Sequence, residues 1–173
     1  PYAHAVRLQD LGYQIETKRE PFFERRSVKT EEEVRSIEAA QRATEEAVAA
    51  AHLTLRAASP RQGVLWLDGE PLTSERVKKL INVKLMERDC VAQHTIVAGG
   101  EQACDPHQEG SGPLPADRSI IFDVFPRSGQ TRYFADMTRT VVKGRASDQL
   151  KRMYDAVLAG PRRGIELVRV GAS

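Results

Sequence analysis

The sequence predicts an α+β fold in which helices cover one face of an antiparallel sheet. Its hydrophobic pattern indicates two helices, then a strand, a hairpin and a last helix, an order typical of this class. The hairpin is indicated by the run IIFDVFPRSGQTRYFADMTRTVV, with strands expected over residues 122–125 and 133–142. Between them stand Pro126, Ser128 and Gly129, the residue types that reverse a chain.

The first 29 residues have the pattern of the end of a preceding unit. A short helix is expected over residues 5–11 and a strand over residues 13–17, followed by a connecting stretch. Stronger helical periodicity begins directly afterwards. We therefore expect two parts, residues 1–29 and a larger domain over residues 30–173.

Two helices follow, each with a recognisable start. Thr30 and Glu33 form a capping box, in which each side chain satisfies a free backbone donor. Small apolar residues then recur at helical spacing until Pro60 ends the helix. These apolar positions are Val34, Ile37, Ala40, Ala47, Val48 and Ala51. Thr73 is expected to cap the second helix.

The second half of the chain is expected to contain a strand, a long loop and a last helix around the hairpin. Residues 91–98 are predicted to form one strand and residues 99–117 a loop, whose length is usually functional or mobile in a compact domain. The last helix is predicted to begin after Ser147 or Asp148. Its period continues beyond Pro161, so we expect a kink there rather than a stop.

The composition is that of an ordinary soluble globular protein, with 40% hydrophobic and 29% charged residues. The net charge of +2 is scattered, and no long basic block points to nucleic acid. No apolar run approaches the ~20 residues of a membrane span, and no signal peptide is visible. Cys90 and Cys104 match no zinc or redox spacing and are expected to be buried in a reducing compartment. We therefore expect a cytoplasmic protein that binds neither nucleic acid nor a membrane.

Asp123 and Asp136 flank the hairpin turn and carry the strongest chemical signal. A turn centred on Gly129 and Gln130 would pair the two aspartates directly, with Cβ atoms roughly 4.5–5.5 Å apart. Like charges in that position cost stability, so a shared proton or a bound cation is needed to compensate. The alternative is that both are turn acids that face water.

Three further side chains could support a site at these aspartates. Thr138 lies two residues after Asp136, on the same strand face, where its hydroxyl could orient a carboxylate. Tyr133 could offer another hydroxyl, although a half-buried aromatic is the commoner role on a strand. His107 is either an exposed loop histidine or a group that folds over the carboxylates to bind substrate or move a proton. His94 is expected to be structural.

The hairpin run resembles the first metal-binding segment of the pita-bread metallopeptidases, the creatinase and aminopeptidase P superfamily, and most closely their Xaa-Pro aminopeptidase and prolidase branch. Further runs follow in the order of that family: RRSVKTEEEVRSIEAAQRATEEAV, LTSERVKKLI, TIVAGGEQACDPHQEGSGPL and MYDAVLAGPRRGIELVRVGAS. The resemblance covers residues 20–173. It implies the N-terminal half of a pita-bread domain over residues 30–173, with residues 1–29 as the end of a creatinase-like N-terminal domain and a linker.

The same resemblance implies a dinuclear metal site. Asp123 would bind one ion, Asp136 would bridge both, and His107 would contact substrate and assist proton movement. Manganese, cobalt, zinc and iron all suit a carboxylate-rich site with a histidine. The two ions would hold a hydroxide that attacks the amide bond before proline in a short peptide. A homodimer is expected for the full-length protein.

The chain departs from the family at the remaining ligands. The family's site needs five, and its histidine and two glutamates lie further along than Ser173, whereas all four histidines here precede Asp123. We therefore expect an internal portion of a longer protein that alone binds metal weakly and is inactive. The alternatives are a non-catalytic pita-bread module that binds a protein partner and a creatinase-like amidinohydrolase. Retention of both Asp123 and Asp136 argues against them.

Overall fold

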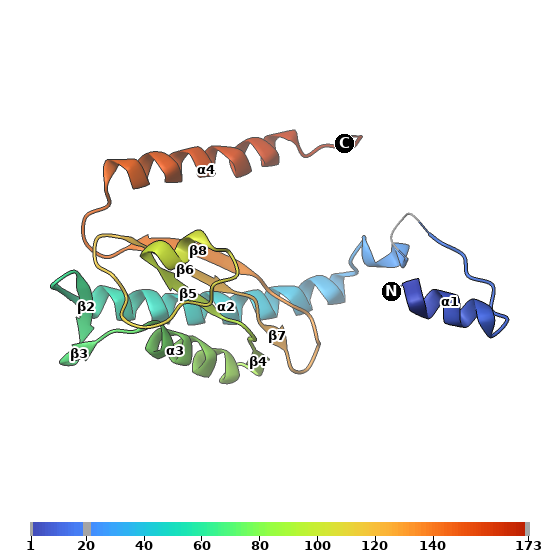
Figure 1. Ribbon diagram of the computed structural model, residues 1–173, viewed down its shortest axis with the longest axis horizontal. Coiled ribbons are helices and arrows are strands. Elements are labelled where there is room, and N and C mark those ends of the chain that lie inside the picture. The colour runs from blue at the N-terminus through green and yellow to red at the C-terminus, as the bar shows by residue number, and fades with distance from the viewer. Residues whose placement is uncertain (1, 19–21, 172–173) are drawn as a thin grey trace. The chain divides into compact units, whose positions relative to one another are not determined.

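The structure, a computed structural model, describes residues 2–18 and 22–171 (Figure 1). The chain separates into two compact units, Pro1–Val34 and Arg35–Ser173. The elements in chain order are α1 (Tyr2–Asp10), η1 (Glu24–Arg26), α2 (Glu31–Ala57), β1 (Ser59–Arg61), β2 (Val64–Leu67), β3 (Glu70–Pro71), α3 (Ser74–Met86), β4 (Cys90–Val91), β5 (Ile96–Gly99), η2 (Gly100–Cys104), β6 (Ser119–Val124), β7 (Arg127–Ser128), β8 (Met137–Val142) and α4 (Asp148–Leu167).

The first unit contains α1, which overlaps the helix predicted over residues 5–11, and the short η1. The strand predicted over residues 13–17 is wrong, because that segment is irregular. A strand needs a neighbour for its backbone N–H and C=O groups, and the described part of this unit offers no partner strand. The unit boundary falls inside α2 rather than at residue 30, and the assignment of residues 1–29 to a preceding domain stays a prediction.

Both predicted helix starts are confirmed. The backbone N–H of Thr30 donates to the Glu33 carboxylate at 2.7 Å, and the Glu33 N–H donates to the Thr30 hydroxyl at 3.3 Å. The Thr73 hydroxyl accepts from the Arg76 N–H at 3.3 Å and caps α3. Val34 is 44% exposed, so the buried stripe of α2 begins later than predicted. Its buried residues are Ala40, Ala43, Thr44, Ala47, Val48, Ala51 and Leu55.

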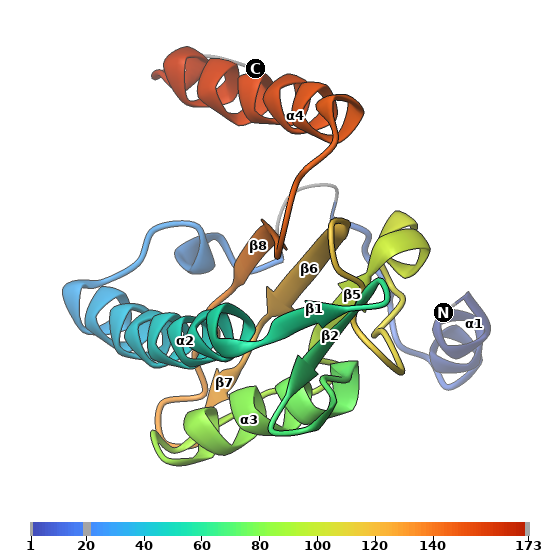
Figure 2. The same ribbon diagram turned by 90° about the vertical axis from the view of Figure 1, so that its left-hand side faces the viewer.

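The central antiparallel sheet has the strand order β5-β6-β8, and α2 and α3 cover one of its faces (Figure 2). Ile120, Phe122 and Val124 of β6 point into the core formed with these helices. The alternate residues Ile121 and Asp123 lie on the opposite face and are only half-buried. The predicted α+β class, with helices on one face of an antiparallel sheet, is therefore confirmed, and the other face carries the candidate site.

The strand predicted over residues 91–98 is divided into β4 and β5. His94 has a φ of 60°, a left-handed conformation that interrupts a strand. Thr95 then turns inward, and its hydroxyl donates to the side-chain oxygen of Asn82 at 2.8 Å. As a result β4 pairs with β7, while β5 pairs with β6. The three-stranded meander β1-β2-β3 was not predicted.

The last helix, α4, begins as predicted and does not stop at Pro161, whereas the kink expected there stays a prediction. The Ser147 hydroxyl accepts from the Leu150 N–H at 3.1 Å, and the helix runs through Pro161 without a break. No residue of α4 is buried. Among the described residues, no helix is both long and apolar enough to cross a bilayer.

Candidate active site

Asp123 pairs directly with Thr138 across β6 and β8, and not with Asp136 as predicted. The predicted register is wrong by two residues because the chain does not reverse at Gly129. The Gly129 N–H is occupied by the carbonyl of Asp89, at 2.6 Å. The reversal lies further on, where Arg132 has a φ of 67°. The turn therefore combines a contact with a distant segment and its own hydrogen bonds, in which Ser128 accepts from the N–H groups of Thr131 and Arg132.

A shift of two residues keeps Asp136 on the same strand face as Asp123. Val124 pairs with Met137, and Pro126 accepts from the Ala135 N–H at 3.0 Å, so Asp136 falls opposite Phe125. The two aspartates are thus diagonal neighbours, a relation that spans roughly 7–8 Å between backbones and less between side chains.

The Asp123 carboxylate acts electrostatically on Asp136. Partial burial raises the pKa of Asp136 above its ordinary range, and the negative charge of Asp123 raises it further. Because the Asp136 side chain is exposed, solvent keeps both effects modest. A cation bound between the carboxylates would remove this repulsion.

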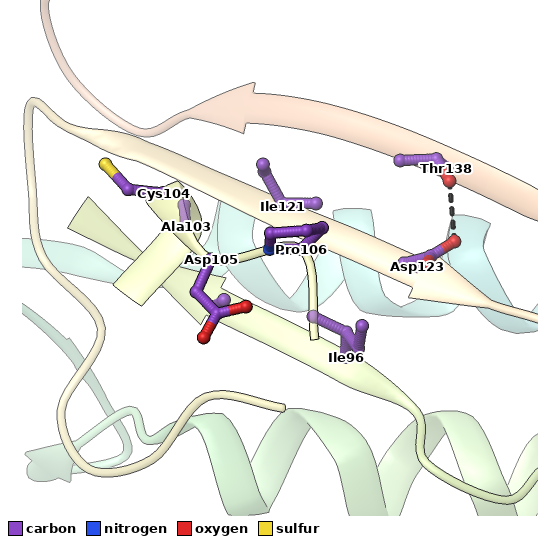
Figure 3. A pocket seen from close by; sticks show the side chains of 9 residues that line it. Ile96, Ala103, Cys104, Asp105, Pro106, Ile121, Asp123 and Thr138 are labelled. Carbon is purple, nitrogen blue, oxygen red and sulfur yellow. Dashed lines mark hydrogen bonds between the residues drawn. The ribbon is translucent and has the colours of Figure 1, made fainter. Parts of the chain in front are cut away.

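Thr138 fixes the orientation of Asp123. Its hydroxyl donates to Oδ1 of Asp123 at 2.6 Å (Figure 3). Oδ2 of Asp123 accepts no hydrogen bond from the described residues and is available to a ligand. A short bond to one oxygen that leaves the other open is the arrangement by which neighbouring groups orient a metal-binding carboxylate.

A cavity of about 330 Å³ lies between the open face of the sheet and the loop that follows β5 (Figure 3). Its apolar lining consists of Ile96, Ala98, Ala103, Pro106 and Ile121. Its ionisable and polar lining consists of Cys104, Asp105, Asp123 and Thr138. The cavity therefore combines an apolar surface with two carboxylates, one of which was not predicted. The only sequence signal for Asp105 is an acid before proline in a long loop.

The cysteine prediction is confirmed for one residue and wrong for the other. Cys90 is 2% exposed, and burial together with the charge of Asp89 raises the pKa of its thiol. Cys104 is exposed and lines the cavity, because the loop folds back over the sheet at this point. The structure contains both as free thiols.

The loop over residues 102–111 is closed by its own hydrogen bonds. The Gln102 side-chain amide donates to the Ser111 carbonyl at 3.1 Å, and the Ser111 N–H donates back to the Gln102 side chain at 3.0 Å. Within the loop, the His107 N–H donates to the Asp105 carboxylate at 2.9 Å. This bond holds Asp105 at the cavity, whereas the His107 side chain is exposed and is not part of the lining.

The structure therefore brings together some of the predicted site residues and not others. Asp123, Asp136 and Thr138 share one face of the hairpin. Tyr133 is half-buried, and strand alternation from Asp136 puts it on the opposite face. His107 lies on the covering loop with its side chain in solvent. The roles of all five residues stay predictions.

The carboxylates fit part of a metal site. Carboxylate oxygens are ligands for divalent cations, and the repulsion that raises the pKa of Asp136 favours a bound cation. Residues 2–18 and 22–171 contain no cluster of three or more histidine, cysteine, aspartate or glutamate side chains that could hold a metal. Asp123 and Asp136 would thus supply an incomplete ligand set.

Comparisons with known proteins agree with this fold. Residues 35–173 match the model of metallopeptidase family M24. Xaa-Pro aminopeptidase 1 of Streptomyces coelicolor is 33% identical over 111 residues, which cover 61% of this chain and 22% of that protein. The chain thus spans about a fifth of the length of that curated relative.

Solved structures show the same fold. The X-Pro aminopeptidase from Thermotoga maritima superimposes with a TM-score of 0.67 at 25% identity, covering 84% of this chain and 38% of that chain. The prolidase from Pyrococcus horikoshii superimposes with a TM-score of 0.68 at 22% identity, covering 82% and 38%. The predicted pita-bread fold is therefore confirmed for the part of the fold that this chain spans.

Proposed function

Because the chain belongs to metallopeptidase family M24, we propose that it forms part of a metal-dependent exopeptidase that hydrolyses Xaa-Pro bonds in short peptides. The observation that carries this proposal is the placement of Asp123 and Asp136 on one open sheet face beside a cavity. The names of the relatives support the substrate class, since one is an Xaa-Pro aminopeptidase and another a prolidase. The tertiary amide before proline differs from an ordinary peptide bond, so a dedicated site is reasonable.

Asp123 and Asp136 would hold the metal ions, with Asp136 bridging two of them. Manganese, cobalt, zinc and iron suit this donor chemistry. A pair of such ions supplies a Lewis acid for the scissile carbonyl and acidifies the attacking water. Thr138 keeps Asp123 in one orientation through its 2.6 Å hydrogen bond. The loop over residues 102–111 contributes Ala103, Cys104, Asp105 and Pro106 to the lining of the cavity.

His107 would move a proton when the loop approaches the substrate. Its backbone is tied to Asp105, so a rotation of the side chain alone can change its reach. Imidazole is the side chain best suited to proton transfer near neutral pH. Tyr133 would act more remotely, by supporting the strand that carries Asp136.

The remaining parts of the proposal concern the whole protein. Residues 1–29 would end a creatinase-like domain, and residues 30–173 would form the first half of the catalytic domain. The remaining ligands would come from elsewhere in the full-length protein, which we expect to be a cytoplasmic homodimer. Residues 1–173 alone would bind metal weakly.

The test is hydrolysis of Ala-Pro and Ala-Pro-Ala by the full-length protein before and after removal of metal with a chelator. We expect cleavage before proline that is lost on chelation and restored by one of the four candidate metals. Asp68→Asn, a change of an exposed acid in the turn between β2 and β3, is a matched control that should retain activity. Absence of cleavage with every metal would favour a non-catalytic module, and cleavage that survives complete metal removal would exclude the metal-dependent reaction.

A further inference from the structure

Asp105 gives the cavity beside Asp123 a second carboxylate, which comes from the covering loop rather than from the sheet. Its Oδ1 accepts from the His107 N–H at 2.9 Å, and this bond holds the side chain in place. Within residues 2–18 and 22–171, Oδ2 of Asp105 accepts no hydrogen bond and the side chain forms no ion pair. Neither lysine nor arginine lines the cavity. The Asp105 carboxylate is therefore open to a positively charged group of a ligand.

The floor of the cavity changes from polar to apolar along the strands. Asp123 pairs with Ile96 on one side and with Thr138 on the other, so these three side chains form one row on the open sheet face. Ala98 and Ile121 pair with each other in the next row, two residues and roughly 6.5 Å further along the strands. The row with Asp123 thus carries the polar groups of the floor, whereas the second row offers only methyl and methylene groups to the cavity.

The covering loop places Asp105 away from Asp123. Strand β5 ends at Gly99 and η2 begins at Gly100, so the loop returns over the sheet from the apolar end of the floor. In the view of Figure 3, Pro106 and Ile121 lie between Asp105 and Asp123. An apolar stretch therefore separates the candidate metal ligand from the carboxylate of the loop.

Apolar walls that end at a carboxylate suit a long aliphatic side chain with a positive charge at its tip. Lysine and arginine bury their methylene stems against apolar surface and keep the charged group at a polar position. The volume of about 330 Å³ is at the lower end of the roughly 300–1,000 Å³ of ligand pockets, so it suits a single side chain. The α-ammonium group of a peptide lies too close to the scissile carbonyl to span the apolar stretch, whereas the ammonium group of lysine stands on a four-carbon stem.

We infer that this cavity holds the side chain of Xaa and that Asp105 makes it selective for a basic residue, lysine or arginine. The inference rests on the proposed function and specifies its substrate class as peptides that begin with a basic residue followed by proline. Asp105 would act as a specificity-determining residue, because its contact is with the tip of the side chain and not with the amide that is hydrolysed.

The test compares kcat/KM for Lys-Pro and for norleucyl-proline in the full-length protein. Norleucine keeps the four-carbon stem and the α-ammonium group and lacks only the terminal ammonium group. We expect wild type to prefer Lys-Pro by about fivefold, a moderate ratio because Asp105 is exposed to solvent. The preference should lie in KM, and it should shrink as the salt concentration is raised from about 0.1 M to about 1 M.

Asp105→Asn removes the charge and keeps an oxygen that can accept from the His107 N–H, so the loop conformation is preserved. In this variant the ratio of the two kcat/KM values should fall to about one, and Asp105→Glu should recover part of it. Glu101→Gln is the matched control. Glu101 is an exposed acid of the same loop region outside the cavity lining, so its loss should leave the ratio at the wild-type value.

Calorimetric titration with free lysine and free norleucine provides a readout that needs no turnover. Wild type should bind lysine about fivefold more tightly than norleucine, and Asp105→Asn should bind the two amino acids equally. Thermal unfolding of Asp105→Asn at the wild-type temperature shows that a changed ratio does not come from misfolding.

The outcomes separate the inference from the proposed function. Hydrolysis of both dipeptides with a ratio that is the same in wild type and Asp105→Asn overturns the inference and leaves the Xaa-Pro peptidase assignment in place. Equal binding of lysine and norleucine to wild type overturns the inference as well. Failure to hydrolyse any Xaa-Pro substrate with any of the candidate metals overturns the proposed function itself.

Discussion

The hydroxyl of Thr138 donates a 2.6 Å hydrogen bond to the carboxylate of Asp123 across the β6–β8 ladder. The two residues are directly opposed, so the strand register determines this contact. One oxygen of Asp123 is fixed by the bond, and the residue lines the cavity. The register of the hairpin is therefore part of the candidate site, because a slip by one residue would move Thr138 to the other face.

Replacing Thr138 with valine removes the hydroxyl and keeps the shape of the side chain. In the full-length protein, we expect metal affinity to fall about 10–100-fold, since groups that orient a ligand typically contribute that much. Titration of the metal-free protein with Mn²⁺ measures the change. Thr138→Ser keeps a hydroxyl and should bind close to wild type. Equal affinities of the valine variant and wild type would show that Thr138 does not orient a metal ligand.

His107→Ala should leave the metal content of the full-length protein unchanged and lower kcat. The His107 side chain is exposed and lies outside the cavity lining, so it should act on substrate or protons rather than on the metal. A positioned acid or base contributes about 10²–10⁴-fold to a rate. His52→Ala, at an exposed position on α2, is the control. Loss of metal together with activity would make His107 a ligand instead.

Glu75 should stabilise the loop in a pH-dependent manner. Its carboxylate accepts from the Gly112 N–H at 3.0 and 3.2 Å, and this bond holds the pKa of Glu75 below its ordinary value. The stabilisation is complete at pH values above the ordinary glutamate pKa of about 4.3. It is lost as the pH falls through the lower pKa of the folded state.

Glu75→Gln should therefore lower the free energy of unfolding at pH 7 by a few tenths of a kcal/mol, a small effect because the residue is exposed. The difference from wild type should shrink as the pH falls below about 4.3. Urea unfolding at several pH values provides the measurement, with Glu70→Gln as the exposed control. A difference that grows on acidification would have the wrong sign.

Gly110 should tolerate no side chain. Its φ is 80°, and an added Cβ would collide with the backbone carbonyl of Val97. We expect Gly110→Ala to destabilise the protein by about 2–4 kcal/mol, the sum of strain and a forced backbone shift. Gly112 has a φ of 70° but open space around it, so Gly112→Ala should cost only about 1 kcal/mol. If thermal unfolding showed the same loss of stability for Gly110→Ala and Gly112→Ala, the close approach of Gly110 to Val97 would not contribute to stability.

Local patterns predicted the helix starts and the core-facing strand because these depend on nearby residues. The Thr30–Glu33 capping box is complete within one turn. Phe122 is buried by a simple alternation along β6. Neither needs information from a distant part of the chain.

The hairpin register could not be predicted in the same way. Gly129 has the composition of a turn centre, but its N–H is taken by Asp89, far upstream in the sequence. Likewise, the left-handed His94 that divides one expected strand into two could not be located from the sequence, because residues other than glycine adopt that conformation only uncommonly. Both depend on tertiary contacts.

Only the part of the candidate site that lies on the hairpin could be predicted, because the rest depends on contacts between distant segments. Asp123, Asp136 and Thr138 share one hairpin and follow from alternation. Asp105 reaches the site through the covering loop, which the Gln102–Ser111 hydrogen bonds close. Such contacts between segments leave no periodic pattern.

The central claim, that Asp123 and Asp136 hold metal ions, is tested most directly by the metal content of the full-length protein and its Asp136→Ala variant. Wild type should contain two divalent ions per chain, and Asp136→Ala should contain none, since the bridging carboxylate would be lost. Asp136→Ala that retains both metal ions would contradict the account.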